Sequence, residues 1–442
     1  MIYRVVCCLV LVGLGSVEGR VLTLESAIAL ALENNDAMRL AEQDRMRAKQ
    51  EIREGWSNAL PDIRLSSNYD RSWVLPTFVF DTPDGQQSFT IGTRNSLTSV
   101  VRLRQSLFSS GRVGAALKAA RAFRAYAEEG YTLSRQTVSA TAQIAFYDVV
   151  LAQSMTQVAN EALTLASANL EQVRSLRRAG RVSDYDLVRA AAQVSSLVPD
   201  SILAEKGLEI ARMSLRDVVG MDQSEDVVLN GTFRTTTSLD YSDLDRVTDV
   251  GLSTRSELQQ AALEVTIREA AVKAQKSEMR PSLDLVASAQ LAVQSNDQSF
   301  SGDEAQESWV TGLSLSIPLF DGMKNRALVN KAQIDRRKAE IQGEQLRKQV
   351  RLEIRQAWFD AREAAQRLEA QEKVLVQAEK GERIARSRYG NGFATQLEVM
   401  DAQLLLTRSR SQLYSAQRDL AVALVMLEKA VGIDDGRSRS ED

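Results

Sequence analysis

The hydrophobic pattern of the chain has two periods, and the shorter one appears first. Apolar residues alternate with polar residues in two neighbouring stretches of the first half, and again in two stretches of the second half. Period two with one polar face is typical of β-strands. The predicted strands cover 63–69, 99–107, 283–291 and 309–319. Polar segments at 81–95 and 294–306 separate the members of each pair, so we expect two β-hairpins joined by loops.

After each predicted hairpin, apolar residues recur every three or four positions, the spacing of an amphipathic helix or coiled coil. No proline occurs from Asp84 to Val198 or from Leu319 to the C-terminus. Helices over 113–179 and 324–389 would each be about 100 Å long. The second has an apolar seam at Leu346, Val350, Ile354, Ala357, Ala361, Ala364, Leu368 and Leu375. Such long helices need neighbouring helices alongside.

A glycine-bearing turn follows each long helix. Gly180 and Gly392 are suited to helix C-termini. Ser183 and Thr395 are suited to the N-caps of return helices. The return helices are expected over 184–219 and 396–431. Proline at position 199 should kink or break the first of them.

Each half also begins with a predicted helix. These helices cover about 24–60 and 242–280, with Thr23 and Ser242 as N-caps. Pro61 and Pro281 follow them, and a helix seldom continues past the residue before a proline. A Thr-, Ser- and Asp-rich linker joins the halves, with a possible short strand at 227–233.

The two halves are an internal duplication. Phe146-Tyr147-Asp148 matches Trp358-Phe359-Asp360 at an offset in residue number of 212 (358 minus 146), and Leu107 matches Leu319 at the same offset. Nearer the start of each half the offset is 220, as between Pro61 and Pro281 (281 minus 61). The first half therefore has eight extra residues (220 minus 212) between Pro61 and Leu107. Insertions collect in exposed loops, so we expect a loop there.

Composition narrows the function. Charged residues make up 26% of the chain, yet the formal net charge is only -3, which argues against a nucleic-acid-binding face. The sequence has no His, which removes the commonest general base and metal ligand. The only cysteines, Cys7 and Cys8, lie in the first apolar stretch.

The N-terminus has the features of a secretory signal. Arg4 precedes an apolar run, and Val17 and Gly19 are small residues before a cut at Arg20. A short buried helix or a membrane anchor is the alternative, but the run is too short to span a bilayer. The predicted divisions are 1–19 (signal peptide), 20–221 (first repeat, β-hairpin 62–107, helical tip near 180), 222–241 (linker), 242–433 (second repeat, β-hairpin 282–319, helical tip near 392) and 434–442 (flexible tail).

Four short strands do not close a barrel alone, whereas three chains would supply about twelve. Aromatic residues cluster toward the loop side of the hairpins, where a girdle would meet the bilayer interface. They are Trp73, Phe78, Phe80, Phe300 and Trp309. The alternative is an ordinary soluble hairpin packed on helices.

The order of these parts resembles the TolC-like outer-membrane efflux protein family over essentially the whole mature chain. Four segments carry the likeness: 22–35, 255–258, 317–322 and 389–403. The resemblance implies a mostly α fold with a small β-barrel contribution: duplicated long-helix hairpins plus four transmembrane strands per chain. It also implies a homotrimer with a twelve-stranded barrel in the outer membrane, on an α-helical periplasmic tunnel. A periplasmic adaptor and an inner-membrane transporter would be its partners in efflux or type I secretion.

The resemblance also assigns residues to the closed end of the tunnel. Glu398 and Asp401 share one helix face. In the family such residues face the tunnel axis, where a trimer would gather carboxylates into one cation-attracting ring. The alternative is a solvated helix face. Tyr389 and Asp186 match positions of the network of bonds that holds the family's gate closed. Ala394 stands where some members have Arg, so the resemblance does not specify which bonds close this gate. The adaptor would dock on the tips, at Gly180, Val182, Ser183, Gly392, Phe393 and Thr395.

No enzyme is expected. The sequence has no nucleophile elbow, P-loop, dinucleotide fingerprint or zinc spacing, and carboxylate pairs are too frequent to be diagnostic. We therefore expect no catalytic residue, no cofactor, no metal and no nucleic-acid partner, but contact with outer-membrane lipid. A soluble periplasmic coiled-coil scaffold or the adaptor itself is the alternative function. The exported cargo is not indicated.

Overall fold

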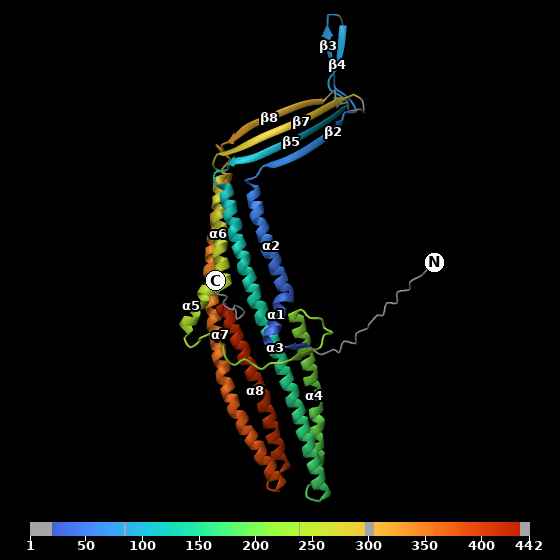
Figure 1. The fold of residues 1–442 in the computed structure, drawn as a ribbon, viewed down its shortest axis with the longest axis vertical. Coiled ribbons are helices and arrows are strands. Elements are labelled where there is room, and N and C mark those ends of the chain that lie inside the picture. The colour runs from blue at the N-terminus through green and yellow to red at the C-terminus, as the bar shows by residue number, and fades with distance from the viewer. Residues whose placement is uncertain (1–19, 84, 238, 297–304, 434–442) are drawn as a thin grey trace, which may run out of the picture. The chain divides into compact units, whose positions relative to one another are not determined.

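The computed structural model describes residues 20–83, 85–237, 239–296 and 305–433 (Figure 1). The predicted signal peptide, the predicted tail and Phe300 lie outside the described residues. Within these ranges, no helix is both long and apolar enough to cross a membrane.

The chain divides into two compact units, each described by itself. The hairpin unit comprises Met1–Glu42, Tyr131–Ser256 and Leu346–Asp442, and the sheet unit comprises Gln43–Gly130 and Glu257–Gln345. Each unit therefore contains segments from both halves of the sequence.

Six elements of the first half each have a counterpart in the second half. The first half contains α1 (Leu24–Asn34), α2 (Asp36–Ser57), β2 (Asp62–Arg71), β5 (Asn95–Phe108), α3 (Arg112–Arg178) and α4 (Asp184–Val219). The second contains α5 (Leu244–Thr254), α6 (Ser256–Ser277), β7 (Ser282–Ser295), β8 (Ala305–Ser316), α7 (Lys324–Gly390) and α8 (Gln396–Val431). The two long helices have 67 residues each, and the two return helices have 36 each.

The opening helices, expected to be continuous, are each interrupted once. Asn35 and Arg255 have extended backbone, with ψ of 133° and 120°. Asn35 Nδ2 donates to the carbonyl of Val218 at 2.9 Å, and Arg255 Nη1 donates to the carbonyl of Ala430 at 3.0 Å. Each break thus places a side chain against the C-terminus of a return helix, where carbonyls lack helical partners.

The observed N-cap is the predicted residue at one of the two opening helices and a different residue at the other. The Thr23 side chain accepts from the backbone N–H of Ser26, which confirms the predicted N-cap of α1. Ser242 was the wrong residue for α5, because the Asp243 side chain accepts from the N–H of Asp245 at 2.9 Å.

In the sheet unit, four antiparallel strands lie in the order β2-β5-β7-β8 (Figure 1). One face of this sheet is apolar and open, with Leu65 70% and Leu313 67% exposed. The other face has polar and charged side chains at the intervening positions of the same strands. The two predicted hairpins are therefore joined edge to edge into one sheet.

The expected loop at 81–95 is wrong. Strands β3 (Thr77–Thr82) and β4 (Gly85–Thr90) pair there as a separate two-stranded sheet. Phe78 and Phe80 lie on this extra hairpin, whereas Trp309 lies on the four-stranded sheet and is 80% exposed. The strand expected at 227–233 is confirmed over β6 (Val227–Leu229), which pairs in parallel with β1 (Arg20–Leu22).

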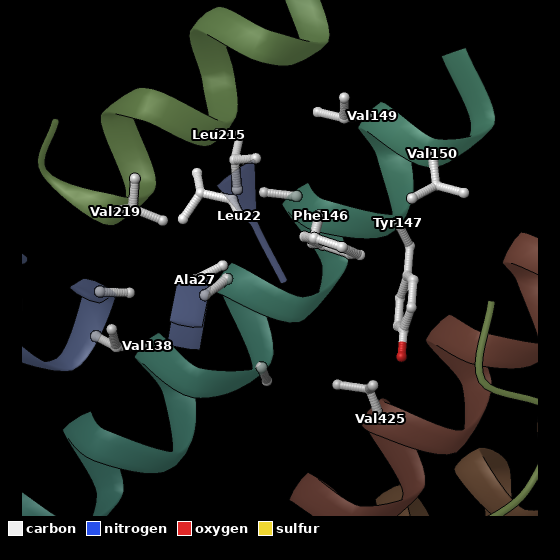
Figure 2. Close-up of a cluster of buried hydrophobic side chains, with 14 of the residues drawn as sticks. Leu22, Ala27, Val138, Phe146, Tyr147, Val149, Val150, Leu215, Val219 and Val425 are labelled. Carbon is white, nitrogen blue, oxygen red and sulfur yellow. The ribbon is translucent and has the colours of Figure 1, made fainter. Parts of the chain in front are cut away.

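The core of the hairpin unit forms where α1, α3, α4 and α8 meet (Figure 2). Phe146 and Tyr147 are fully buried there, with Leu215 and Val425 among their neighbours. Gly231 passes so close to Phe146 that a Cβ would lie 2.7 Å from its ring. An aromatic side chain of this size stabilises the core by removing its whole surface from water.

Polar contacts join the members of each helical hairpin. Arg367 Nη2 lies 2.8 Å from Asp419 Oδ2 between α7 and α8. Ser201 Oγ donates to Asn160 Oδ1 at 2.7 Å between α4 and α3. Pro199 was expected to kink or break α4; the helix continues through it, so it causes no break. The expected seam of α7 is confirmed where Val350 and Ile354 are fully buried.

Candidate functional site at the hairpin tips

The turns that join α3 to α4 and α7 to α8 have the same backbone design, at the same end of the hairpin unit (Figure 1). The N–H of Arg181 donates to the carbonyl of Leu176 at 2.9 Å, and the N–H of Phe393 donates to that of Arg388 at 2.8 Å. Gly180 and Gly392 have φ of 71° and 80°. Left-handed backbone of this kind favours glycine, as expected for these two positions.

Each return helix begins with a reciprocal capping box. The Ser183 side chain accepts from the N–H of Asp186, whose carboxylate accepts from the N–H of Ser183 at 3.0 Å. Thr395 and Glu398 repeat this arrangement, and the Glu398 carboxylate accepts from the N–H of Thr395 at 3.1 Å. These bonds satisfy N–H groups that a helix N-terminus leaves unpaired, so both predicted N-caps are confirmed.

The expected constriction residues have different surroundings. The backbone N–H and hydroxyl of Thr395 hold the pKa of the Glu398 carboxyl below its usual range. Asp401 is exposed one turn further along α8. The capping role of Glu398 is readable from Thr395 and Glu398 themselves, three residues apart, but it was not among our expectations.

Tyr389 lies in an apolar cluster formed by both hairpins. It is 8% exposed and packs with Leu170, Val173, Ala190 and Val399. Its hydroxyl is buried and has no hydrogen-bond partner within the described part of the chain. Burial, and then the charge of Asp186, raise the pKa of Tyr389. The structure therefore brings Tyr389 and Asp186 into one electrostatic neighbourhood without a hydrogen bond between them.

One pair of equivalent positions makes different contacts in the two tips. In the first tip, Arg177 and Asp184 form a two-bond ion pair with N–O distances of 2.6 and 2.9 Å. This contact holds the pKa of Asp184 below its usual range. The equivalent positions in the second repeat are Tyr389 and Gln396. Gln396 is 4% exposed, and neither polar atom of its amide has a partner within the described ranges.

Gln396 was not identified from sequence, because a single Gln at a helix start carries no signal of burial. It adds a second unsatisfied polar group to the tip where the Tyr389 hydroxyl is also unsatisfied. Leaving a buried polar group without a hydrogen bond costs about 1–3 kcal/mol. The unpaired groups therefore make the second tip less stable by itself than the first.

Five of the six residues expected to dock a partner are exposed at the tips. Phe393 is 74% exposed, and Ser183 and Thr395 are exposed as well. Val182 is half-buried in the apolar cluster. A Cβ at either Gly180 or Gly392 would meet no atom within 4 Å, so both turns are open to solvent. No group of three or more Cys, Asp or Glu within the described ranges is placed to hold a metal ion.

Two long helical hairpins and a four-stranded sheet with an open apolar face are the main parts of the described chain. The family model for outer membrane efflux proteins matches residues 27–221 and 249–433. The chain belongs to the outer membrane efflux protein family, which confirms the resemblance seen in the sequence.

Known proteins agree with this assignment. The outer membrane protein TolC of Escherichia coli (strain K12) is 23% identical over 415 residues, which cover 90% of this chain and 80% of TolC. Protein CyaE of Bordetella pertussis is 26% identical over 344 residues, which cover 77% of this chain and 72% of CyaE. The CmeC outer membrane channel of Campylobacter jejuni has the same fold, with a TM-score of 0.79 at 18% identity, over 95% of this chain and 87% of CmeC. The protein is thus an outer-membrane efflux or secretion channel with a large periplasmic part.

Proposed function

We propose that three copies of this chain form a passive export duct. The observation that carries the proposal is the four-stranded sheet, in which one face is apolar and exposed and the other is polar. Strands β2 and β8 each have one unpaired edge among the described strands. Unpaired edges invite pairing with another chain, and lipid favours the apolar face. Edge-to-edge pairing of three copies would close a sheet of about twelve strands.

The hairpin tips would form the gate of this duct. Tyr389 and Asp186 are near enough to interact, and the Tyr389 hydroxyl lacks a partner within the described part of the chain. Contact between neighbouring tips in the trimer would supply that partner. Glu398 and Asp401 would form the constriction, as a ring of carboxylates that attracts cations. Since Glu398 also caps α8, Asp401 is the less constrained of the two carboxylates.

A periplasmic adaptor and an inner-membrane transporter would complete the export system. The exposed Phe393 ring follows Gly392 in the turn between α7 and α8 and offers an apolar contact at one tip of each chain. Docking there would act on the turns that set the spacing of α7 and α8. The transporter would supply the energy, and the duct itself would perform no catalytic step.

Two measurements test the proposal. Membrane fractionation, followed by gels of unheated and heated samples, should place the protein in the outer membrane as a heat-sensitive oligomer. The purified oligomer in planar bilayers should show cation-preferring single channels. Replacing Glu398 and Asp401 together by Ala should raise conductance and reduce cation preference, whereas unchanged values would remove both residues from the constriction. A monomer in the soluble periplasmic fraction would instead support the scaffold or adaptor.

A further inference from the structure

The polar face of the four-stranded sheet has a hollow of about 860 Å³ at the end of the sheet where β2 begins. Four arginines line it: Arg64, Arg102, Arg104 and Arg112. Two carboxylates, Asp62 and Asp284, also line it. The hollow belongs to the sheet unit and is therefore separate from the hairpin tips.

Both carboxylates are already engaged. Arg64 forms two bonds of 2.8 Å with Asp62, and Arg104 Nη2 lies 2.6 Å from Asp284. Arg112 pairs with Glu278 at 2.9 Å. Of the four guanidinium groups, only that of Arg102 has no carboxylate partner among the residues that the structure describes.

Strand register places the positive charge of Arg102 opposite that of a second arginine. Arg102 on β5 lies directly opposite Arg64 on β2. Like charges at directly opposed positions of an antiparallel pair destabilise the sheet. Ser106 also lines the hollow, and its hydroxyl is buried without a hydrogen-bond partner in the described ranges. An anion in the hollow would offset the repulsion between the two guanidinium groups.

We propose that this hollow binds phosphate-type oxyanions, as free ions or as groups on exported cargo. A guanidinium group presents paired N–H donors that match two oxygens of such an anion. The inference rests on the proposed duct, in which the polar face of the sheet would line the water-filled passage. Three copies would then place three such sites around the passage.

The test uses inorganic pyrophosphate as the probe and the purified full-length oligomer as the sample. Pyrophosphate should bind in calorimetry and reduce single-channel current. Arg102→Gln should weaken both effects roughly tenfold, the loss expected for one charged hydrogen bond. Arg102→Lys, which keeps the charge, should weaken them less. Arg71→Gln, at the far end of β2, is the matched control and should match the unaltered protein.

Each outcome decides between the two hypotheses. Channels without pyrophosphate binding, or equal binding by the Arg102→Gln variant, would overturn the oxyanion site and leave the duct intact. Binding that Arg102→Gln weakens, in a protein that forms no channels, would support the site and contradict the duct. If Arg102→Gln fails to fold, the comparison of Arg102→Lys with Arg71→Gln decides: equal affinity would overturn the site.

Discussion

Replacing Tyr389 by Phe removes one hydroxyl and leaves the apolar packing of the ring in place. In the single chain that hydroxyl is buried and has no partner within the described ranges, a condition that costs about 1–3 kcal/mol. The substitution should therefore leave the fold equally stable or make it more stable. An effect on the gate would then be separable from an effect on folding.

The closed assembly should respond in the opposite direction. If the Tyr389 hydroxyl donates to the Asp186 carboxylate at the tip of a neighbouring copy, each such contact contributes about 1.5–3 kcal/mol to closure of the channel. Since about 1.4 kcal/mol corresponds to a tenfold change in an equilibrium, each lost contact should raise the open fraction about tenfold or more.

Single-channel recording of open probability is the assay. Tyr185→Phe is the matched control, because Tyr185 is at the first tip and its side chain is 70% exposed. Tyr389→Phe should increase open probability while the control does not, and thermal unfolding should not occur at a lower temperature. Open probability equal to that of the unaltered protein would refute the gate contact.

Other predictions concern the core, the turns and pH. Phe146→Ala should destabilise the hairpin unit by about 3–5 kcal/mol, since a fully buried ring leaves a cavity, and thermal unfolding measures this. Gly220→Ala should destabilise the protein far more than Gly180→Ala. Both residues have positive φ, but only at Gly220 would a Cβ lie 2.7 Å from a neighbouring side chain. The depressed pKa of Glu398 means that its contribution to stability is present above its unfolded pKa and is lost as pH falls through the folded value. Thr395→Ala should raise that pKa, so acid-induced changes in conductance should begin at higher pH.

A specific experimental outcome would contradict each of these predictions. Unfolding of Phe146→Ala at an unchanged temperature would mean that the cluster in Figure 2 adds little to stability. Equal losses at Gly220 and Gly180 would show that backbone strain outweighs the close contact. Ser183→Ala is the equivalent change at the other tip. If Thr395→Ala and Ser183→Ala gave the same acid response, protonation of Glu398 would not control the conductance.

Much of the fold was predictable because regular patterns repeat at a constant register. The long helices begin at Arg112 and Lys324, which are equivalent positions of the two repeats, and both glycine turns have the expected left-handed backbone. The helix breaks were not predictable, since Asn35 and Arg255 act through carbonyls of Val218 and Ala430, which lie far along the chain. The β3–β4 hairpin was missed because β4 is mostly polar, as a loop would be, although β3 contains Phe78, Val79 and Phe80.

The candidate site was only partly predictable. Capping at Ser183 and Thr395 follows from local residue types, which short-range hydrogen bonds satisfy. The burial of Tyr389 and Gln396 depends on how the two hairpins pack, and nothing adjacent to them in the sequence records it. The oxyanion hollow depends on strand register, which places Arg64 and Arg102 opposite each other although they lie well apart along the chain.

Duplication within one chain also has a consequence for symmetry. A ring built from six identical single repeats would have to carry the same contact at every tip. With two repeats per chain, neighbouring tips can alternate: the Arg177–Asp184 ion pair at one, and Tyr389 with Gln396 at the next. In the proposed trimer, three tips would then be locked by their own ion pairs, and three would depend on their neighbours. Evolution could therefore alter the ease of opening in one set without loosening the other.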